Sequence, residues 1–228
     1  QELHALLKVC DDWAAIDLSG LERGVQTHRC EHCNPQKQQR CRAYQRLLAQ
    51  LQGARDHQFF GVQFRAIYLI ALNHMFYPVD IGSISKAAVD FKNGHVKFRR
   101  GKTDTVRVGI LLPVTIDAIQ AWLNFRHDGH DLLFLNTAGS AWSTKGLGER
   151  LAEHREVAGL TDETLTFRAF RKGGYEAALR NPHVDLYTAK ILAGHATGIT
   201  DSYVDANPER CRLAVESIGR VYSLLDRH

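Results

Sequence analysis

The stretch LAGHATGITDSY at residues 192–203 decides how this chain is interpreted. A Gly-His pair whose histidine is His195 ends an apolar run, and Tyr203 follows eight positions later. Upstream, Arg168 and Arg171 stand three positions apart at the expected start of a helix. These residue types suit attack on a phosphodiester, because a phenol can act as the nucleophile while cationic donors hold the phosphate.

Composition sets the broad class. The chain has 228 residues and is 44% hydrophobic, enough to bury a core of ordinary domain size. No apolar run approaches the roughly 20 residues that span a bilayer, and residues 1–4 lack the features of a signal peptide. We therefore expect a cytoplasmic protein without a membrane partner. Because Gln1 replaces an initiator Met, we expect a processed, truncated or excised chain.

Charge favours a polyanionic partner. The formal net charge is +4, and basic residues concentrate locally. One group falls within eleven positions and a second within five: Lys97, Arg99, Arg100, Lys102 and Arg107, then Arg168, Arg171 and Lys172. The alternative interpretation of such runs is a solvated face without a ligand.

Hydrophobic periodicity predicts a mainly helical α+β protein with helices around a small three-stranded antiparallel sheet. Helices are expected over 2–13, 43–52, 59–76, 79–85, 115–125 (with an N-cap at Thr115), 147–158, 170–179, 187–193 and 208–225, and strands over 89–91, 95–98 and 105–108. The polar stretch 17–42 has little periodicity and is expected to be an insertion. We divide the chain into an N-terminal part, 1–58, and a catalytic domain, 59–228.

In this order, the segments resemble the C-terminal catalytic domain of tyrosine recombinases, the phage integrase family, over roughly residues 62–218. The resemblance implies a site-specific DNA recombinase or integrase of a mobile element that breaks and rejoins double-stranded DNA. The intermediate would be a 3′-phosphotyrosyl enzyme, with no ATP or metal required. It also implies a homo-oligomer on DNA and a separate core-binding domain, which nothing in this chain resembles.

The resemblance assigns a role to each matching position. Tyr203 matches the nucleophile, Arg171 the second family arginine, and Arg168 a position that usually carries His. His195 would donate to the phosphate or accept the proton of the tyrosine hydroxyl. Lys102, in the turn between the last two expected strands, matches the lysine that protonates the leaving 5′-oxygen, with Arg100 as the alternative.

Three basic residues are expected to contact the DNA backbone: Arg99, Arg100 and Lys172.

One position departs from the family pattern. The family places its first arginine three residues before an acidic residue, and Asp80 fits the acid while Tyr77 stands where the arginine belongs. An oxyanion donor is worth on the order of 10²–10³ in rate, so an uncompensated loss would impair catalysis. Either Arg168 compensates or Tyr77 donates a neutral hydrogen bond.

A second group of residues indicates metal binding. The pattern His28-x-Cys30-x-x-Cys33 is followed by Cys41, and thiolates with an imidazole can hold a structural Zn²⁺. Free thiols are the alternative, since the second half of the motif is irregular. The chain has five cysteines in all, an odd number that favours a reduced compartment over a disulfide framework.

The last expected helix carries an apolar stripe at Ala214, Ile218, Val221 and Leu225. Docking on the core of the same chain and docking on a neighbouring protomer are both open.

Three alternatives to a recombinase remain. The first is a catalytically impaired DNA-binding module on the same fold, suggested by Tyr77. The second is a type IB topoisomerase, which shares the chemistry but relaxes supercoils as a monomer. The third is a zinc-organised interaction domain, which would bind metal and show no salt-sensitive DNA binding.

Overall fold

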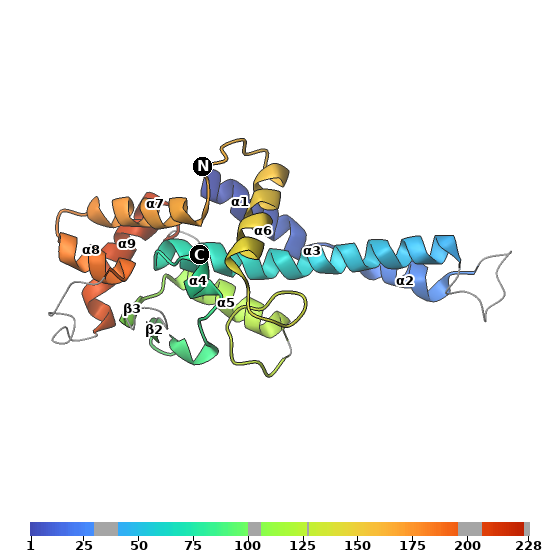
Figure 1. Ribbon diagram of the computed structural model, residues 1–228, viewed down its shortest axis with the longest axis horizontal. Coiled ribbons are helices and arrows are strands. Elements are labelled where there is room, and N and C mark those ends of the chain that lie inside the picture. Colours follow the sequence, from blue (N-terminus) through green and yellow to red (C-terminus); the bar gives the residue numbers. More distant parts are fainter. Residues whose placement is uncertain (30–40, 100–105, 127, 196–206, 226–228) are drawn as a thin grey trace.

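The computed structural model describes residues 1–29, 41–99, 106–126, 128–195 and 207–225. The helices are α1 (Glu2–Ala14), α2 (Ser19–Thr27), α3 (Arg42–Asn73), α4 (Pro78–Ile81), α5 (Pro113–Phe125), α6 (Thr144–Val157), α7 (Phe167–Leu179), α8 (Leu186–Ala193) and α9 (Arg212–Val221), with short 3₁₀ helices η2 (Lys86–Ala88) and η4 (Pro208–Cys211). The strands are β1 (Val89–Asp90), β2 (His95–Arg99) and β3 (Val106–Ile110). The predicted fold class, helices around a three-stranded antiparallel sheet, is confirmed (Figure 1).

Helix α3 is the spine of the molecule. Its second half, from Phe60 to Asn73, is buried almost continuously, because α1, α5 and α7 all pack against it. Gly61 allows the close approach of α1, since a Cβ there would lie 2.5 Å from the Ala14 nitrogen. The core therefore surrounds the second half of α3, and the elements that follow are arranged around it.

The first half of α3 projects from this body together with α2 (Figure 1). An ion pair at 2.9 Å between Arg55 and Glu22 connects the two helices. One expectation was wrong here, because the two helices predicted over 43–52 and 59–76 are one. The polar stretch 17–42 also contains a helix, α2, which was not predicted and which buries none of its residues. Gly53 does not interrupt α3, because the cost of about 1 kcal/mol is offset by the strong helix formers around it.

The sheet is a meander in the order β1-β2-β3, as predicted. Val96 and Phe98 of β2 are buried, while Lys97 and Arg99 between and beside them are exposed. By contrast, β3 is buried from Arg107 to Ile110 because α8, α9 and η4 lie against it. The basic run at 97–107 is thus not one solvated face, since Arg107 is an interior residue.

Helix α5 begins at Pro113, with Leu112 rather than Thr115 as its N-cap. Thr115 is buried, and its hydroxyl donates to Asn73 Oδ1 at 3.2 Å. The Asn73 amide donates in turn to the Ile110 carbonyl at 3.1 Å. This buried amide ties the end of α3 to the junction between β3 and α5.

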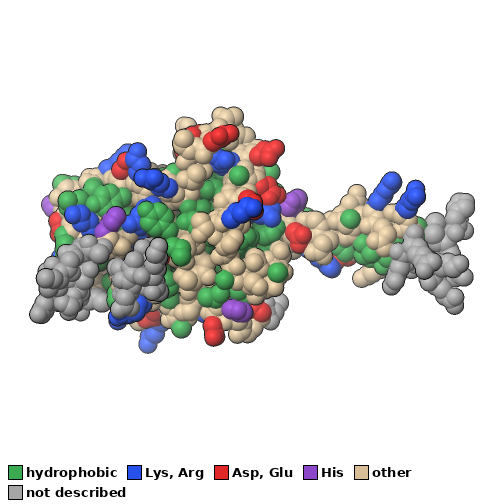
Figure 2. Space-filling view, viewed as in Figure 1, with side chains coloured by type: hydrophobic (Ala, Val, Ile, Leu, Met, Phe, Trp, Pro, Cys, Tyr) green, Lys and Arg blue, Asp and Glu red, His purple; other side chains and the backbone are tan. Residues whose placement is uncertain are grey.

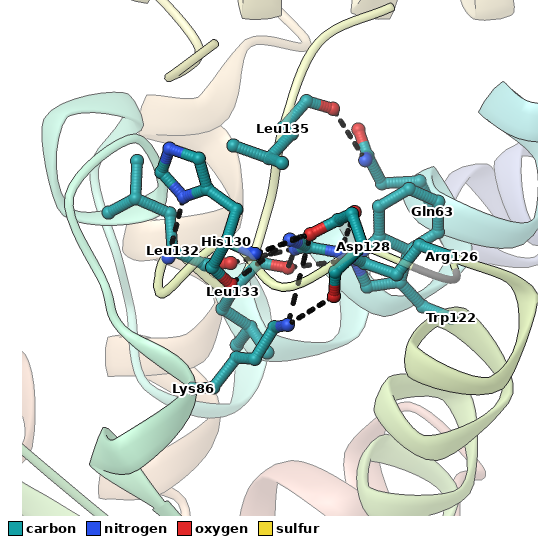
Figure 3. Close-up of polar contacts among 9 residues, drawn as sticks. All are labelled: Gln63, Lys86, Trp122, Arg126, Asp128, His130, Leu132, Leu133 and Leu135. Carbon is teal, nitrogen blue, oxygen red and sulfur yellow. Dashed lines mark hydrogen bonds and ion pairs between the residues drawn. The ribbon is translucent and has the colours of Figure 1, made fainter. Parts of the chain in front are cut away.

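The segment after α5 is held to the core by Arg126, which is 7% exposed (Figure 3). Its guanidinium donates to the carbonyls of Leu132 at 2.7 Å and Leu133 at 2.8 Å. Trp122 Nε1 donates to the same Leu133 carbonyl at 2.8 Å. Arg126 is therefore a structural arginine that satisfies buried backbone acceptors.

Helix α9 packs on α7 and α3, and Ala214 and Ile218 are fully buried there. Of the two interpretations of its apolar stripe, docking on the same chain is the one observed. In the described part of the chain, no helix combines the length and apolar character needed to cross a membrane.

Candidate active site

Two helix ends meet at the candidate site, the C-termini of α3 and α8. At the first, Met75 has a positive φ of 53°, and the Phe76 N–H donates to the Ala71 carbonyl at 3.1 Å. At the second, Gly194 has a φ of 65°, and the His195 N–H donates to the Lys190 carbonyl at 2.9 Å. Both are Schellman-type ends, which leave carbonyls of negative partial charge directed outwards from the helix.

Arg171, on α7, lies between these two helix ends. Its Nη1 donates to the Met75 carbonyl at 2.9 Å and to the Ala193 carbonyl at 2.6 Å. Its Nη2 lies 3.1 Å from His195 Nε2. The predicted pair Arg171 and His195 is therefore brought into direct contact, with the arginine 7% exposed and the histidine at the surface.

Arg107, on β3, makes a parallel set of contacts and was not predicted as a site residue. Its Nη2 donates to the Leu192 carbonyl at 3.0 Å and to the His74 carbonyl. The neighbouring His74 ring is fully buried, and burial together with the Arg107 charge lowers the pKa of this imidazole to about 3. The ring is therefore neutral and adds no second positive charge beside the guanidinium.

Asp80 and Tyr77 flank the two arginines from α4. Asp80 Oδ2 accepts from the Tyr77 backbone N–H at 2.9 Å and lies 3.4 Å from Arg107 Nη1. The side chains of Asp80 and Arg107 are both 0% exposed. The Tyr77 ring lies under the Arg171 guanidinium, 4.4 Å from ring centroid to Cζ. Asp80 is thus a buried partner of Arg107 behind the candidate site, and the Tyr77 ring packs against Arg171.

A surface cavity of about 260 Å³ opens over this arrangement. Its lining comes mainly from α7 and consists of Tyr77, Arg168, Arg171, Lys172, Tyr175, Glu176 and His195. Lys and Arg side chains gather over α7 in the view of Figure 2. Three cations against one carboxylate give the cavity a positive charge, and this balance favours an anionic ligand.

Two lining residues were missed at the sequence level. Tyr175 lies four residues after Arg171 and is therefore on the same helical face, with its ring 6.2 Å from that of His195. Glu176 pairs with Lys172 at 3.7 Å on the exposed surface of α7. The spacing of 168, 171, 172 and 175 was the available signal for a shared face.

The remaining predicted residues are distributed as follows. Arg168 and Lys172 are exposed on α7, and Arg99 is exposed at the end of β2. Tyr203, Lys102 and Arg100 lie outside the described residues, so their roles stay predictions. Arg168 borders both this cavity and a neighbouring one of about 290 Å³ that also includes Tyr77.

The projecting arm, formed by α2 and the first half of α3, holds two of the predicted metal ligands at its end. His28 Nε2, just after α2, lies 3.4 Å from Cys41 Sγ, just before α3. Cys30 and Cys33 lie outside the described residues. Within the described part of the chain, no group of three or more potential ligands is found.

The model of the phage integrase family matches residues 41–210. The chain belongs to the phage integrase family. That match extends from α3 through η4 and includes every described residue of the cavity. Among curated protein sequences, none is detectably similar to this family member.

Solved structures share its fold. XerH site-specific recombinase, in a post-cleavage complex with a palindromic difH substrate, is 16% identical with a TM-score of 0.54; the alignment covers 99% of this chain and 52% of that one. The integrase from mycobacterium phage Brujita is 16% identical with a TM-score of 0.53, and the alignment covers 96% and 84% of the two chains. This family member thus spans about half the length of the XerH chain.

Proposed function

We propose that this chain is the catalytic part of a site-specific DNA recombinase or integrase that acts on double-stranded DNA. The observation that carries the proposal is the cationic cavity in which the Arg171 guanidinium contacts His195, 3.1 Å away, with Arg168 at the rim. Guanidinium groups hold phosphate oxygens in a fixed fork, and this arrangement suits the charge that develops in phosphoryl transfer.

In the proposed reaction, the Tyr203 phenolic oxygen attacks the phosphorus of the scissile phosphodiester. The bond to the 5′-oxygen breaks, and Lys102 delivers the proton that this leaving oxygen needs. The product is a 3′-phosphotyrosine and a free 5′-hydroxyl, whose attack on a phosphotyrosine reverses the step and joins the strands. Arg171 and Arg168 stabilise the charge on the phosphate, and His195 donates to it or accepts the tyrosine proton.

The DNA would lie across the cavity and the exposed face of the sheet, where Arg99 and Lys172 reach the surface. Such backbone contacts make binding fall steeply with salt. Joining two DNA sites requires more than one active site, so we propose that the protein acts as a homo-oligomer on DNA.

A catalytically impaired DNA-binding module is the second candidate, and Tyr77 in place of the first family arginine is the observation that favours it. A nicked suicide substrate carrying the flanks of the encoding element separates the two. A recombinase gives a covalent protein–DNA band that Tyr203→Phe abolishes. Salt-sensitive binding without that band, on a substrate known to contain the site, would identify the impaired module.

We also propose a structural Zn²⁺ at the end of the arm. His28 and Cys41 are already 3.4 Å apart, and Cys30 and Cys33 follow His28 closely in sequence. A metal would stabilise this polar segment, which has few apolar residues to bury. The proposed reaction itself requires no metal.

A further inference from the structure

Two arginines from different elements hold neighbouring carbonyls of the same two helix ends. At the end of α3, Arg107 donates to the His74 carbonyl and Arg171 donates to the next carbonyl, that of Met75. At the end of α8, Arg107 donates to the Leu192 carbonyl and Arg171 donates to the next carbonyl, that of Ala193. The two guanidiniums thus join the same two segments, one from the interior and one beside the cavity.

The two arginines differ in what else they contact. Arg171 reaches His195 and the cavity. Arg107 is 0% exposed, and among the described residues it also contacts the interior Asp80 carboxylate at 3.4 Å and the Phe76 ring, 4.6 Å from its centroid. Since Arg107 has no exposed surface, it cannot itself contact DNA in this conformation.

Arg107 also lies directly behind the residue that precedes His195. A Cβ at Gly194 would be 2.8 Å from Arg107 Nη1. The position of the guanidinium therefore limits where the backbone of Gly194 can be. Because His195 follows immediately, the place of its ring depends on the same contact.

We propose that Arg107 is a positioning residue that supports the site from the interior and does not itself replace the phosphate contact of the first family arginine. It supplies the cation that pairs with Asp80 and holds the end of α8, so that Arg171 and His195 meet at the cavity. The inference rests on the proposed function and deepens it. It explains how the site can accommodate Tyr77, which packs its ring on Arg171.

The chain offers a matched control. Arg126 is also buried and donates to two consecutive carbonyls, Leu132 and Leu133, on a segment that forms no part of the cavity (Figure 3). Arg107→Lys and Arg126→Lys both keep the charge and lose the guanidinium fork. An effect confined to Arg107→Lys therefore reports on the site, whereas a loss of stability common to both variants does not.

The experiment measures two quantities for each variant. The first is the single-turnover rate of covalent-adduct formation at saturating nicked DNA, beside the DNA dissociation constant. The second is the His195 Cε1–H resonance in DNA-free protein, assigned with His195→Gln. Arg107→Lys is expected to lower the cleavage rate about ten- to hundredfold at unchanged DNA affinity and to shift the resonance. Arg126→Lys is expected to change neither.

Asp80→Asn removes the charge of the other partner in the Arg107–Asp80 pair and should also shift the His195 resonance. This variant tests the proposal if Arg107→Lys fails to fold. An unshifted resonance in the folded variants would overturn the positioning role, as would wild-type cleavage by Arg107→Lys. A wild-type protein that binds DNA but forms no adduct would contradict the proposed function instead. In that case the His195 resonance still decides the role of Arg107.

Discussion

Replacing Gly194 with Ala tests whether the end of α8 is held against Arg107. Gly194 has a φ of 65°, and alanine in this left-handed region costs about 1–2 kcal/mol. The new Cβ would also lie 2.8 Å from Arg107 Nη1 and 3.0 Å from its Cδ and Cζ. The guanidinium cannot easily withdraw, because it is fully buried and bonded to Asp80, His74 and Leu192. Overpacking of this kind adds about 1–3 kcal/mol.

Gly159 provides the comparison. It ends α6 with the same hydrogen-bond pattern, the Leu160 N–H donating to the Arg155 carbonyl at 2.9 Å, and its φ is 69°. A Cβ there would meet nothing within 4 Å. Gly159→Ala therefore carries the backbone cost alone, whereas Gly194→Ala carries this cost and the contact with Arg107.

We expect Gly159→Ala to lower the free energy of unfolding by about 1–2 kcal/mol and Gly194→Ala by about 2–5 kcal/mol. For a chain of this length each kcal/mol corresponds to about 2–4 °C in Tm. Thermal unfolding followed by circular dichroism, with urea unfolding alongside, measures the difference between the variants. Equal losses for the two would refute the argument that Arg107 fixes this turn.

Three further predictions follow from the site and its surroundings. Tyr77→Arg is expected not to raise the cleavage rate, because Asp80 already pairs with Arg107, and because Arg171 would have a second cation beside it in place of the aromatic ring. Tyr77→Phe is the control that keeps the ring. Faster adduct formation by Tyr77→Arg in the suicide-substrate assay would contradict this prediction. Burial lowers the pKa of His74 and His154 to about 3, so on acidification the unfolded chain binds protons before the folded protein does. Below pH about 6.5, acidification is therefore expected to lower the free energy of unfolding by up to about 1.4 kcal/mol per pH unit for each buried imidazole. Urea unfolding near pH 7.5 and pH 5 should show a smaller loss for His154→Gln than for wild type, and equal losses would count against the neutral buried ring. For the arm, metal analysis of protein purified without chelator should find about one Zn²⁺ per chain, as one tetrahedral site holds one ion; Cys41→Ser should lose it and the buried Cys10→Ser should keep it, whereas metal-free wild type would argue for free thiols.

The helix that carries Arg168 and Arg171 and the helix end at Gly194 were predictable from the sequence, because their signals are local. Arg168 and Arg171 are a short helical spacing apart, and Gly194 marks a helix end at the position where a left-handed residue is needed. The meander was equally accessible, since its strands alternate and its turns carry turn residues. Each of these features depends on residues within one or two turns of the chain.

The unity of α3 was not predictable in the same way. Its first half is covered chiefly by α2, whereas the second half is buried on most sides. The apolar pattern therefore changes along one continuous helix, and in the sequence the change near Gly53 resembles the end of one helix and the start of another. Only the tertiary contacts show that the helix continues. The division of the chain at residue 58 stays a prediction, although α3 runs through it.

Arg107 was hidden for a related reason. Alternation along β3 places Val106, Val108 and Ile110 on one face and Arg107 on the other, as expected of a strand with one solvated side. In the fold both faces of β3 are covered, and Arg107 lies opposite Phe98 on the interior face of β2. A charged residue on a buried face requires a partner, and Asp80 is 27 positions away in sequence.

Arg107 and Arg171 each place a positive charge against the C-termini of α3 and α8. Each C-terminus carries partial negative charge, so cations placed between two such ends stabilise their approach. Arg107 provides an interior cation that donates to carbonyls of both helix ends and has no exposed surface. Arg171 provides the second cation at the surface, next to His195. The cation beside Asp80 is therefore Arg107, and the aromatic ring at position 77 packs against the face of Arg171.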